Sequence, residues 1–103
     1  MDKTEFAKRL NDLLTQENKS ARELSLLLGQ HPGYINAICT EKAYPSMEVF
    51  FNICEELKIS PVEFFDESYK YPNKVNELLP YLKEINHDEF ENIAMIIKAL
   101  SKK

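Results

Sequence analysis

Two cysteines and two histidines are the side chains of this 103-residue sequence best suited to covalent or metal chemistry. Cys39 and Cys54 lie fifteen positions apart without a Cys-x-x-Cys pair, and neither His31 nor His87 has metal-ligand spacing to them. We therefore expect reduced thiols that act as small apolar residues, no metal ion and no cofactor. A redox role for Cys39 is a minor alternative.

The sequence contains no motif typical of an enzyme active site. It has no Gly-x-Ser-x-Gly turn, no glycine-rich phosphate loop and no His-Glu-x-x-His motif. No small-molecule ligand is evident from the residue pattern either. We expect a protein that binds a macromolecule and not an enzyme.

The chain has the composition of a small globular protein, with 44% hydrophobic residues. No window of about eighteen apolar residues could form a membrane span, and the N-terminal MDKTEFAKRL lacks the apolar core of a signal peptide. These features predict a cytoplasmic protein with no membrane partner.

Apolar residues recur at helical spacing, and no run alternates with the period of two that a strand requires. The pattern predicts an all-α protein whose first 66 residues form five helices. The first three are expected over 4–17, 20–28 and 32–40, and two more begin near 46 and 60.

Local signals mark the ends of these helices. Ser20 and Ser60 each open an S-x-x-E capping box, and Ser46 can cap the fourth helix. Gly29 stands where a left-handed C-terminal cap belongs, and Pro32 suits the first position of the third helix. The pair 20–28 and 32–40, joined by a short turn containing Gly, is a helix-turn-helix pattern.

From Phe6 to Phe65 the sequence resembles the phage-repressor class of helix-turn-helix domain, the Cro-type or XRE family. SARELSLLLG is similar to the first helix of the family's motif and HPGYINAIC to its recognition helix. KAYPSMEVFFNICEELKISPVEFF is similar to the turn, fourth helix and closing segment of the family. The resemblance implies a five-helix lambda-repressor-like domain over residues 1–66.

The resemblance also implies a function, namely sequence-specific binding of double-stranded DNA by a transcriptional regulator. We expect a repressor that inserts helix 32–40 into the major groove of a palindromic operator, because no separate sensor or activation domain fits in the length. The implied DNA-binding residues are Arg22, Gln30, His31, Pro32, Gly33, Tyr34, Asn36, Ala37, Thr40 and Lys42.

Within this set, the correspondence places four residues at the base edges and the others toward the phosphate backbone. Asn36 can bond adenine, Ala37 can meet a thymine methyl group and Tyr34 can reach a phosphate. Pro32 and Gly33 have no side-chain donor for a base edge. Gly33 has two open interpretations, which are close approach to DNA and tight packing of its helix against helix 20–28.

Two positions depart from the family's habits. Ala21 replaces a frequent Gln, and Glu41 replaces a frequent Gly. Glu41 must adopt another turn or a left-handed conformation, and its carboxylate would repel phosphate. His31 is expected at the N-cap position that Ser or Thr fills in relatives.

The charge balance leaves a second class of function open. Residues 1–66 carry seven Lys or Arg and eleven Asp or Glu, a net charge of −4, whereas the remaining 37 residues carry six of each. An acidic module with few bases binds DNA weakly unless it is dimeric. The alternative is a protein-interaction module on the same fold, such as an antitoxin-like or regulator-binding partner.

A polar joint over 67–71 precedes a predicted two-helix hairpin over 72–103. Pro80 should kink its first helix, and Asn86 with Glu89 should cap its second. The hairpin buries too little alone, so it packs either on the first domain or on a second copy, forming a homodimer. The residues assigned to dimerisation are Leu82, Phe90, Ile93, Ile97 and Leu100.

Overall fold

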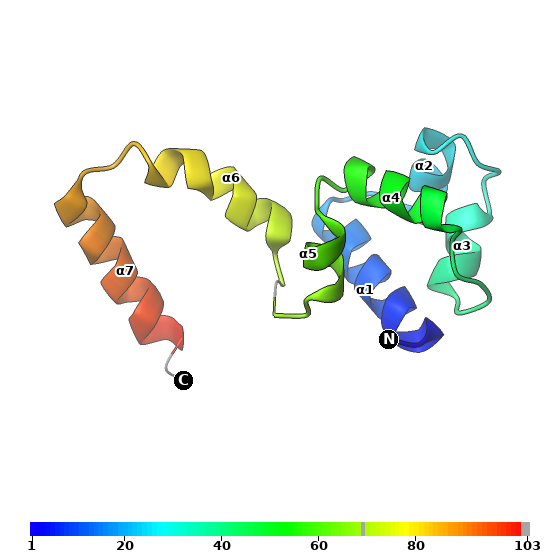
Figure 1. Cartoon of the computed structure of the whole chain (residues 1–103), viewed down its shortest axis with the longest axis horizontal. Coiled ribbons are helices and arrows are strands. Elements are labelled where there is room, and N and C mark those ends of the chain that lie inside the picture. Colours follow the sequence, from blue (N-terminus) through cyan, green and yellow to red (C-terminus); the bar gives the residue numbers. More distant parts are fainter. Residues whose placement is uncertain (69, 102–103) are drawn as a thin grey trace. The chain divides into compact units, whose positions relative to one another are not determined.

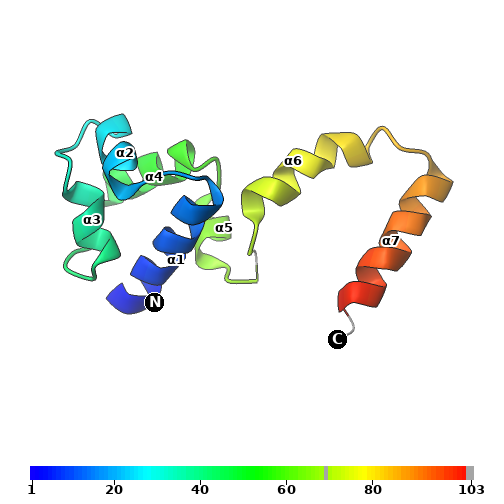
Figure 2. The same cartoon turned by 180° about the vertical axis from the view of Figure 1, so that it is seen from behind.

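The computed structural model describes residues 1–68 and 70–101, and it contains α-helices and no strand among them. In chain order the helices are α1 (Lys3–Gln16), α2 (Ala21–Leu27), α3 (Tyr34–Cys39), α4 (Met47–Glu56), α5 (Pro61–Phe65), α6 (Pro72–Leu82) and α7 (His87–Ser101) (Figures 1 and 2). The all-α prediction is confirmed, as is the order of five helices followed by two more.

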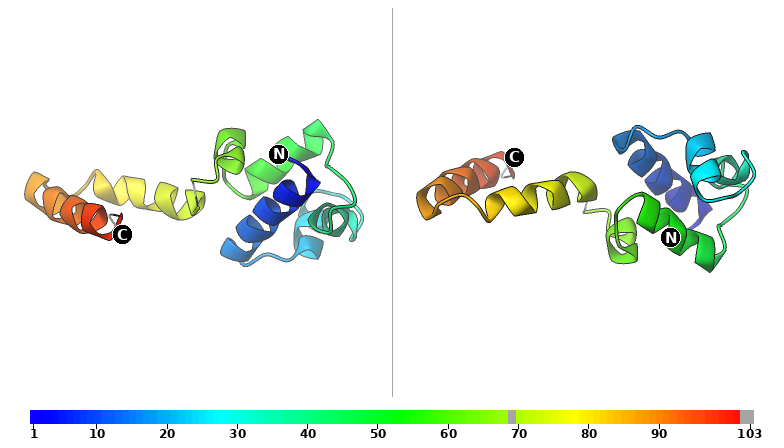
Figure 3. Two further views of the ribbon diagram at one scale, coloured as in Figure 1. Left: turned by 90° about the horizontal axis from the view of Figure 1, so that it is seen from below. Right: turned by 90° about the horizontal axis from the view of Figure 1, so that it is seen from above.

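The chain divides into two compact units, Met1–Asn73 and Lys74–Lys103. In the first unit α3 packs against both α2 and α1, while α4 contacts α2 and α5 (Figure 3). One apolar core lies between these helices, and its buried members are Phe6, Leu10, Leu13, Leu14, Leu24, Ile35, Ile38, Val49, Phe50, Ile53, Cys54, Leu57, Ile59 and Phe64. Aromatic rings close it on one side, where the Phe64 ring centroid lies 4.9 Å from that of Phe6 and 5.1 Å from that of Phe50.

Side-chain caps start most helices at the residues that the sequence predicts. The Ser46 hydroxyl accepts the Val49 backbone N–H at 3.2 Å, which opens α4. Reciprocal capping boxes open α2, α5 and α7, and the residue pairs that form them are Ser20 with Glu23, Ser60 with Glu63, and Asn86 with Glu89. These local predictions are confirmed.

The first four helices end in the same left-handed motif. After α2, Gly29 has φ +72°, as predicted; after α1, α3 and α4 the equivalent residues are Asn18, Glu41 and Lys58, with φ of 54°, 65° and 58°. In each case the next residue donates its N–H to a carbonyl five residues earlier, as in a Schellman motif. Of the two alternatives left open for Glu41, another turn or a left-handed conformation, the structure has the left-handed one, and three non-glycine residues carry its steric cost.

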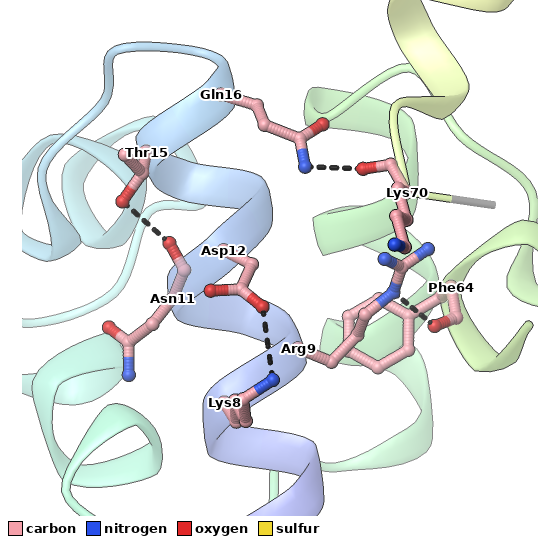
Figure 4. Close-up of polar contacts among 8 residues, drawn as sticks. All are labelled: Lys8, Arg9, Asn11, Asp12, Thr15, Gln16, Phe64 and Lys70. Carbon is pink, nitrogen blue, oxygen red and sulfur yellow. Dashed lines mark hydrogen bonds and ion pairs between the residues drawn. The ribbon is translucent and has the colours of Figure 1, made fainter. Parts of the chain in front are cut away.

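A buried arginine joins the first helix to the fifth. Arg9 is 6% exposed, and its guanidinium donates to the Phe64 carbonyl at 2.8 Å (Figure 4) and to the Glu63 carbonyl at 2.6 Å. A cation at the carbonyl end of a helix interacts favourably with its dipole and its unpaired acceptors. The five-residue α5, too short to be stable alone, is thereby held against α1.

The segment after α5 is also tied to the first unit. The Gln16 side chain donates to the Lys70 carbonyl (Figure 4), and the Asn73 amide donates to the Glu17 carboxylate and the Leu57 carbonyl. Pro72 is fully buried. The beginning of α6 therefore belongs to the first unit, and the remainder belongs to the second.

The described residues of the second unit form no buried core of their own. α7 buries no side chain, and the only buried residues of α6 are Pro72 and Asn73, which belong to the first unit. α6 continues through Pro80 to Leu82, and from the turn that follows, α6 and α7 diverge with few mutual contacts (Figure 1). The two predicted helices are present, and most of their large apolar side chains are exposed. No helix in the part of the chain that the structure describes is long and apolar enough to cross a bilayer.

Candidate nucleic-acid interface

The helix that the sequence places at 32–40 begins later than predicted. α3 spans Tyr34–Cys39, so the assignment of Pro32 to its first position is wrong. The Tyr34 N–H donates to the His31 carbonyl at 3.1 Å, which closes a turn around Pro32 and Gly33. Gly33 has φ −93° and ψ 1°, the values of the third residue of a type I turn, in which Pro is favoured at the second. The fixed φ of Pro32 suits both the first turn of a helix and a type I turn, and the chain forms the type I turn.

Gly33 is not required by packing. A Cβ atom added there would meet only the His31 imidazole, at 3.6 Å, so the interpretation that Gly33 packs tightly against α2 is wrong. Its φ is also open to other residues. The other interpretation, close approach of this exposed turn to DNA, stays a prediction.

His31 caps this turn and not the helix. Its Nδ1 accepts the Gly33 N–H at 3.2 Å, and its ring lies edge-on to that of Tyr34 with centroids 5.9 Å apart. The N-cap residue of α3 is Gly33, which makes no side-chain cap, so the expectation that His31 holds the N-cap position is wrong. The ring stays exposed beside the turn.

A residue that the sequence interpretation missed supports the start of α3. The Ser25 hydroxyl on α2 is fully buried, accepts the Ile35 N–H at 3.0 Å and donates to the Ala21 carbonyl at 2.8 Å. The only signal in the sequence is a polar residue within the apolar run LSLLL. Such a contact joins the two helices of the motif directly.

The other end of α3 is held by α1. The Asn11 side chain donates to the Cys39 carbonyl at 3.3 Å, and the Thr4 hydroxyl donates to the Glu41 carboxylate. The Tyr34 hydroxyl accepts the Ser46 N–H at 3.4 Å, at the start of α4. Three helices thus fix the position of α3, and none of these contacts was evident from sequence spacing.

The structure places most of the predicted DNA-binding residues on the surface of α2, α3 and their flanking turns. The exposed ones are Arg22, His31, Pro32, Gly33, Asn36, Thr40 and Lys42, and the half-buried ones are Gln30, Tyr34 and Ala37. The Asn36 carboxamide bonds no other residue of the described chain, so its donor and acceptor are both available. The Thr40 hydroxyl, in contrast, donates to the Asn36 carbonyl at 2.8 Å.

The charges around α3 are arranged more favourably than the net charge suggests. Arg22 and Lys42 are exposed and form no ion pair with a described residue. The neighbouring acids are held by the protein itself, because Glu23 accepts the Ser20 N–H and Glu41 accepts the Thr4 hydroxyl. Glu23 is thus held by a backbone N–H and Glu41 by a side-chain hydroxyl, while Arg22 and Lys42 have no acidic partner in the described chain, and such local distribution matters more than net charge.

Neither thiol has the character of a redox centre. Burial raises the pKa of Cys54 to about 11 and also raises the pKa of Cys39. Both are free cysteines, and little of either is thiolate near neutral pH. This disfavours the redox alternative for Cys39. Among the described residues, no three side chains of His, Cys, Asp or Glu are grouped as metal ligands.

Comparison with known proteins agrees with this geometry. A family model described as helix-turn-helix matches residues 10–64, more than half of the chain. The matched segment contains α2, α3 and the turn between them, together with α4. Neither the curated proteins nor the solved structures include a match to the chain.

Proposed function

We propose, from the premise that the chain belongs to the helix-turn-helix family of the Cro/XRE type, that it is a sequence-specific transcriptional repressor. The family is one of DNA-binding regulators, and α3 is the helix that would enter the major groove. The proposal rests mainly on one observation: the carboxamide of Asn36 is exposed and bonds no other residue of the described chain. An Asn amide can bond adenine N6 and N7 together, so this side chain supplies direct readout.

Backbone contacts would come from both sides of α3. Arg22 in the first turn of α2 and Lys42 after α3 are exposed bases without acidic partners among the described residues. The Tyr34 hydroxyl accepts the Ser46 N–H, which leaves its own proton for a phosphate oxygen. These contacts would position α3, while Asn36 and Ala37 would discriminate between sequences.

The proposed DNA-binding form is a dimer on an inverted repeat. Taking 100° per residue, a stripe about 160° wide, broader than the seam that one neighbouring helix covers, contains six apolar residues of α7: Phe90, Ile93, Ala94, Ile96, Ile97 and Leu100. Large residues of this stripe and of α6 are exposed in the single chain, and they are Val75, Leu78, Leu79, Phe90, Ile93, Ile96, Ile97 and Leu100. Two copies of α6 and α7 packed as a four-helix bundle would cover them.

Dimerisation also compensates for the acidic charge. Each copy offers few exposed bases at the candidate interface, and a dimer doubles the number of phosphates contacted. Two half-sites about one helical turn apart would then match the two-fold symmetry of the protein. A bound dimer represses by covering the DNA that other proteins need.

Selection of binding sites from random-sequence duplex DNA at low salt tests this proposal. We expect enrichment of an inverted repeat with half-site centres about 10 base pairs apart. Enrichment of a single half-site would remove the dimer from the proposal, and absence of any enrichment would remove sequence-specific binding.

A second candidate function is a protein-interaction module on the same fold. Two observations favour it: the net charge of −4 in residues 1–66, and the uncovered apolar faces of α6 and α7. On this alternative the partner is an amphipathic helix of another protein, and DNA affinity is negligible at physiological salt. A protein that selects no duplex but whose partner binding is abolished by Ile93→Asp would establish the alternative.

A further inference from the structure

The first turn of α3 has no cap of its own. The N-cap residue is Gly33, which has no side chain, and the first N–H groups of any helix lack partners within the helix. In most helices a Ser, Thr, Asp or Asn side chain at the N-cap accepts the N–H of the second or third helical residue. For α3 that second residue is Ile35, which is completely buried and beyond the reach of water.

Ser25 supplies the missing acceptor from another helix. Its Oγ lies 3.0 Å from the Ile35 nitrogen, which is the contact that an N-cap side chain makes. Its hydroxyl proton goes to the Ala21 carbonyl at 2.8 Å, so a lone pair is directed at Ile35. Both bonds of the hydroxyl are therefore defined, and the side chain is fully buried.

The hydrogen bond between Ser25 and Ile35 fixes the position of α3 relative to α2 more closely than apolar packing alone does. Leu24 and Ile35 pack beside it without any exposure, but contacts between such side chains are not directional. A hydrogen bond of 3.0 Å restricts both the sliding and the rotation of α3 relative to α2. Asn36 follows Ile35 directly, so its direction depends on the placement of this one peptide group.

We infer that Ser25 is a positioning residue for the DNA-reading surface, and that its hydroxyl sets the direction of Asn36 by capping α3 from α2. The inference rests on the proposed function for its effect on DNA. Without the hydroxyl, the buried Ile35 N–H has no acceptor, and the first turn of α3 must fray or shift to find one. The ratio of affinities for operator and random DNA should then fall by more than the loss of folding stability accounts for.

Ser25→Ala and Ser60→Ala form the matched pair for the test. Both substitutions remove a serine hydroxyl that caps a helix, but Ser60 caps α5 and forms no hydrogen bond with a described residue of α3. Two quantities are measured for each full-length variant: amide hydrogen exchange of Ile35 by NMR, and the ratio of affinities for selected and random duplexes. For Ser25→Ala we expect at least tenfold faster exchange at Ile35 and a roughly tenfold lower ratio. Equal behaviour of the two variants overturns the inference.

Conservative variants keep the test decisive if Ser25→Ala does not fold. Ser25→Thr retains a hydroxyl acceptor and Ser25→Cys offers only a weak one. Protection of Ile35 should decrease in the order Ser, Thr, Cys, and the affinity ratio should follow the same order. A Thr variant that protects Ile35 yet loses discrimination would overturn the inference.

Failure of the proposed function is separable from failure of the inference. Exchange at Ile35 needs no DNA, so it reports on the cap alone. If the wild-type protein selected no duplex, the proposed function and the role of Ser25 in discrimination would both fall. Unchanged exchange in Ser25→Ala would overturn the cap itself, even where DNA selection succeeds.

Discussion

The Nε atom of Arg9 donates a 2.8 Å hydrogen bond to the carbonyl of Phe64, although 55 residues separate the two in sequence. The bond closes the first unit by joining α1 to the end of α5. It is buried, and the same guanidinium also reaches the Glu63 carbonyl. The ring of Phe64 also packs against that of Phe6, with centroids 4.9 Å apart.

We expect Arg9→Met to lower the free energy of unfolding by about 2–4 kcal/mol, because buried carbonyls lose a charged donor. Lys8→Met is the control, since Lys8 is exposed and its ion pair with Asp12 spans 3.8 Å, which predicts a change below about 1 kcal/mol. Urea denaturation followed by circular dichroism measures both. Equal effects of the two substitutions would show that the buried contact adds nothing.

The left-handed residues after α1, α3 and α4 predict a stabilising substitution. Lys58→Gly removes a conformational cost of about 1–2 kcal/mol and adds an unfolded-state cost of about 0.5–1, so stability should rise by about 0.5–1 kcal/mol. Gly29→Ala, at the equivalent position after α2, should lower it by about 1 kcal/mol. Thermal unfolding of both variants checks the pair, and a destabilised Lys58→Gly would contradict it.

Gly33→Ala separates stability from DNA binding. An added Cβ meets only the His31 ring at an ordinary contact distance, so we expect stability to be unchanged or raised by about 0.4–1 kcal/mol. If the turn approaches DNA closely, affinity for the selected duplex should nevertheless fall. A Gly33→Ala variant that is more stable and binds the selected duplex as tightly as the wild-type protein would show that the turn does not touch DNA.

The uncovered face of α7 predicts which substitution breaks the dimer. Ile93→Asp places a charge in the apolar stripe, and we expect the dimer dissociation constant to rise at least about tenfold. Met95→Asp is the matched control, because Met95 is exposed on the opposite side of the helix. Sedimentation equilibrium measures the dimer dissociation constant of both variants and of the wild-type protein. A wild-type protein that stays monomeric at all concentrations would exclude the dimer.

Thiol reactivity tests the conclusion about the cysteines. Raised pKa values leave little thiolate at pH 8, so iodoacetamide should alkylate native Cys39 and Cys54 much more slowly than the same residues in urea. Mass spectrometry over time measures both rates. Rapid labelling of native Cys39, with loss of DNA binding that Cys39→Ser prevents, would restore the redox hypothesis.

Features encoded by neighbouring residues could be predicted from the sequence, and features that join distant residues could not. The capping boxes and the left-handed cap at Gly29 depend on local spacing and were predicted, whereas for Glu41 the sequence left both a left-handed conformation and another turn open. The start of α3 was misplaced because a proline has the same φ in a type I turn and in a first helical turn. Arg9, Asn11 and Ser25 act through partners that only the folded chain brings near.

The apolar faces of α6 and α7 show a second limit. Their periodicity predicted two amphipathic helices, which the structure contains. Periodicity does not say what covers such a face, and within the second unit itself most of its large apolar side chains are exposed. The dimerisation residues therefore remain a prediction.

Base reading by Asn36 is tested by titrating selected operator DNA with three forms of the protein. Wild-type protein, Asn36→Ala and the control Asn52→Ala, an exposed asparagine on α4, are each bound to the operator and to a duplex with one half-site base pair changed. We predict that Asn36→Ala alone loses about 1–3 kcal/mol of affinity for the operator and no longer distinguishes the two duplexes at that position. If Asn36→Ala discriminates between the duplexes as well as Asn52→Ala does, α3 does not read DNA through Asn36 and the claim is wrong.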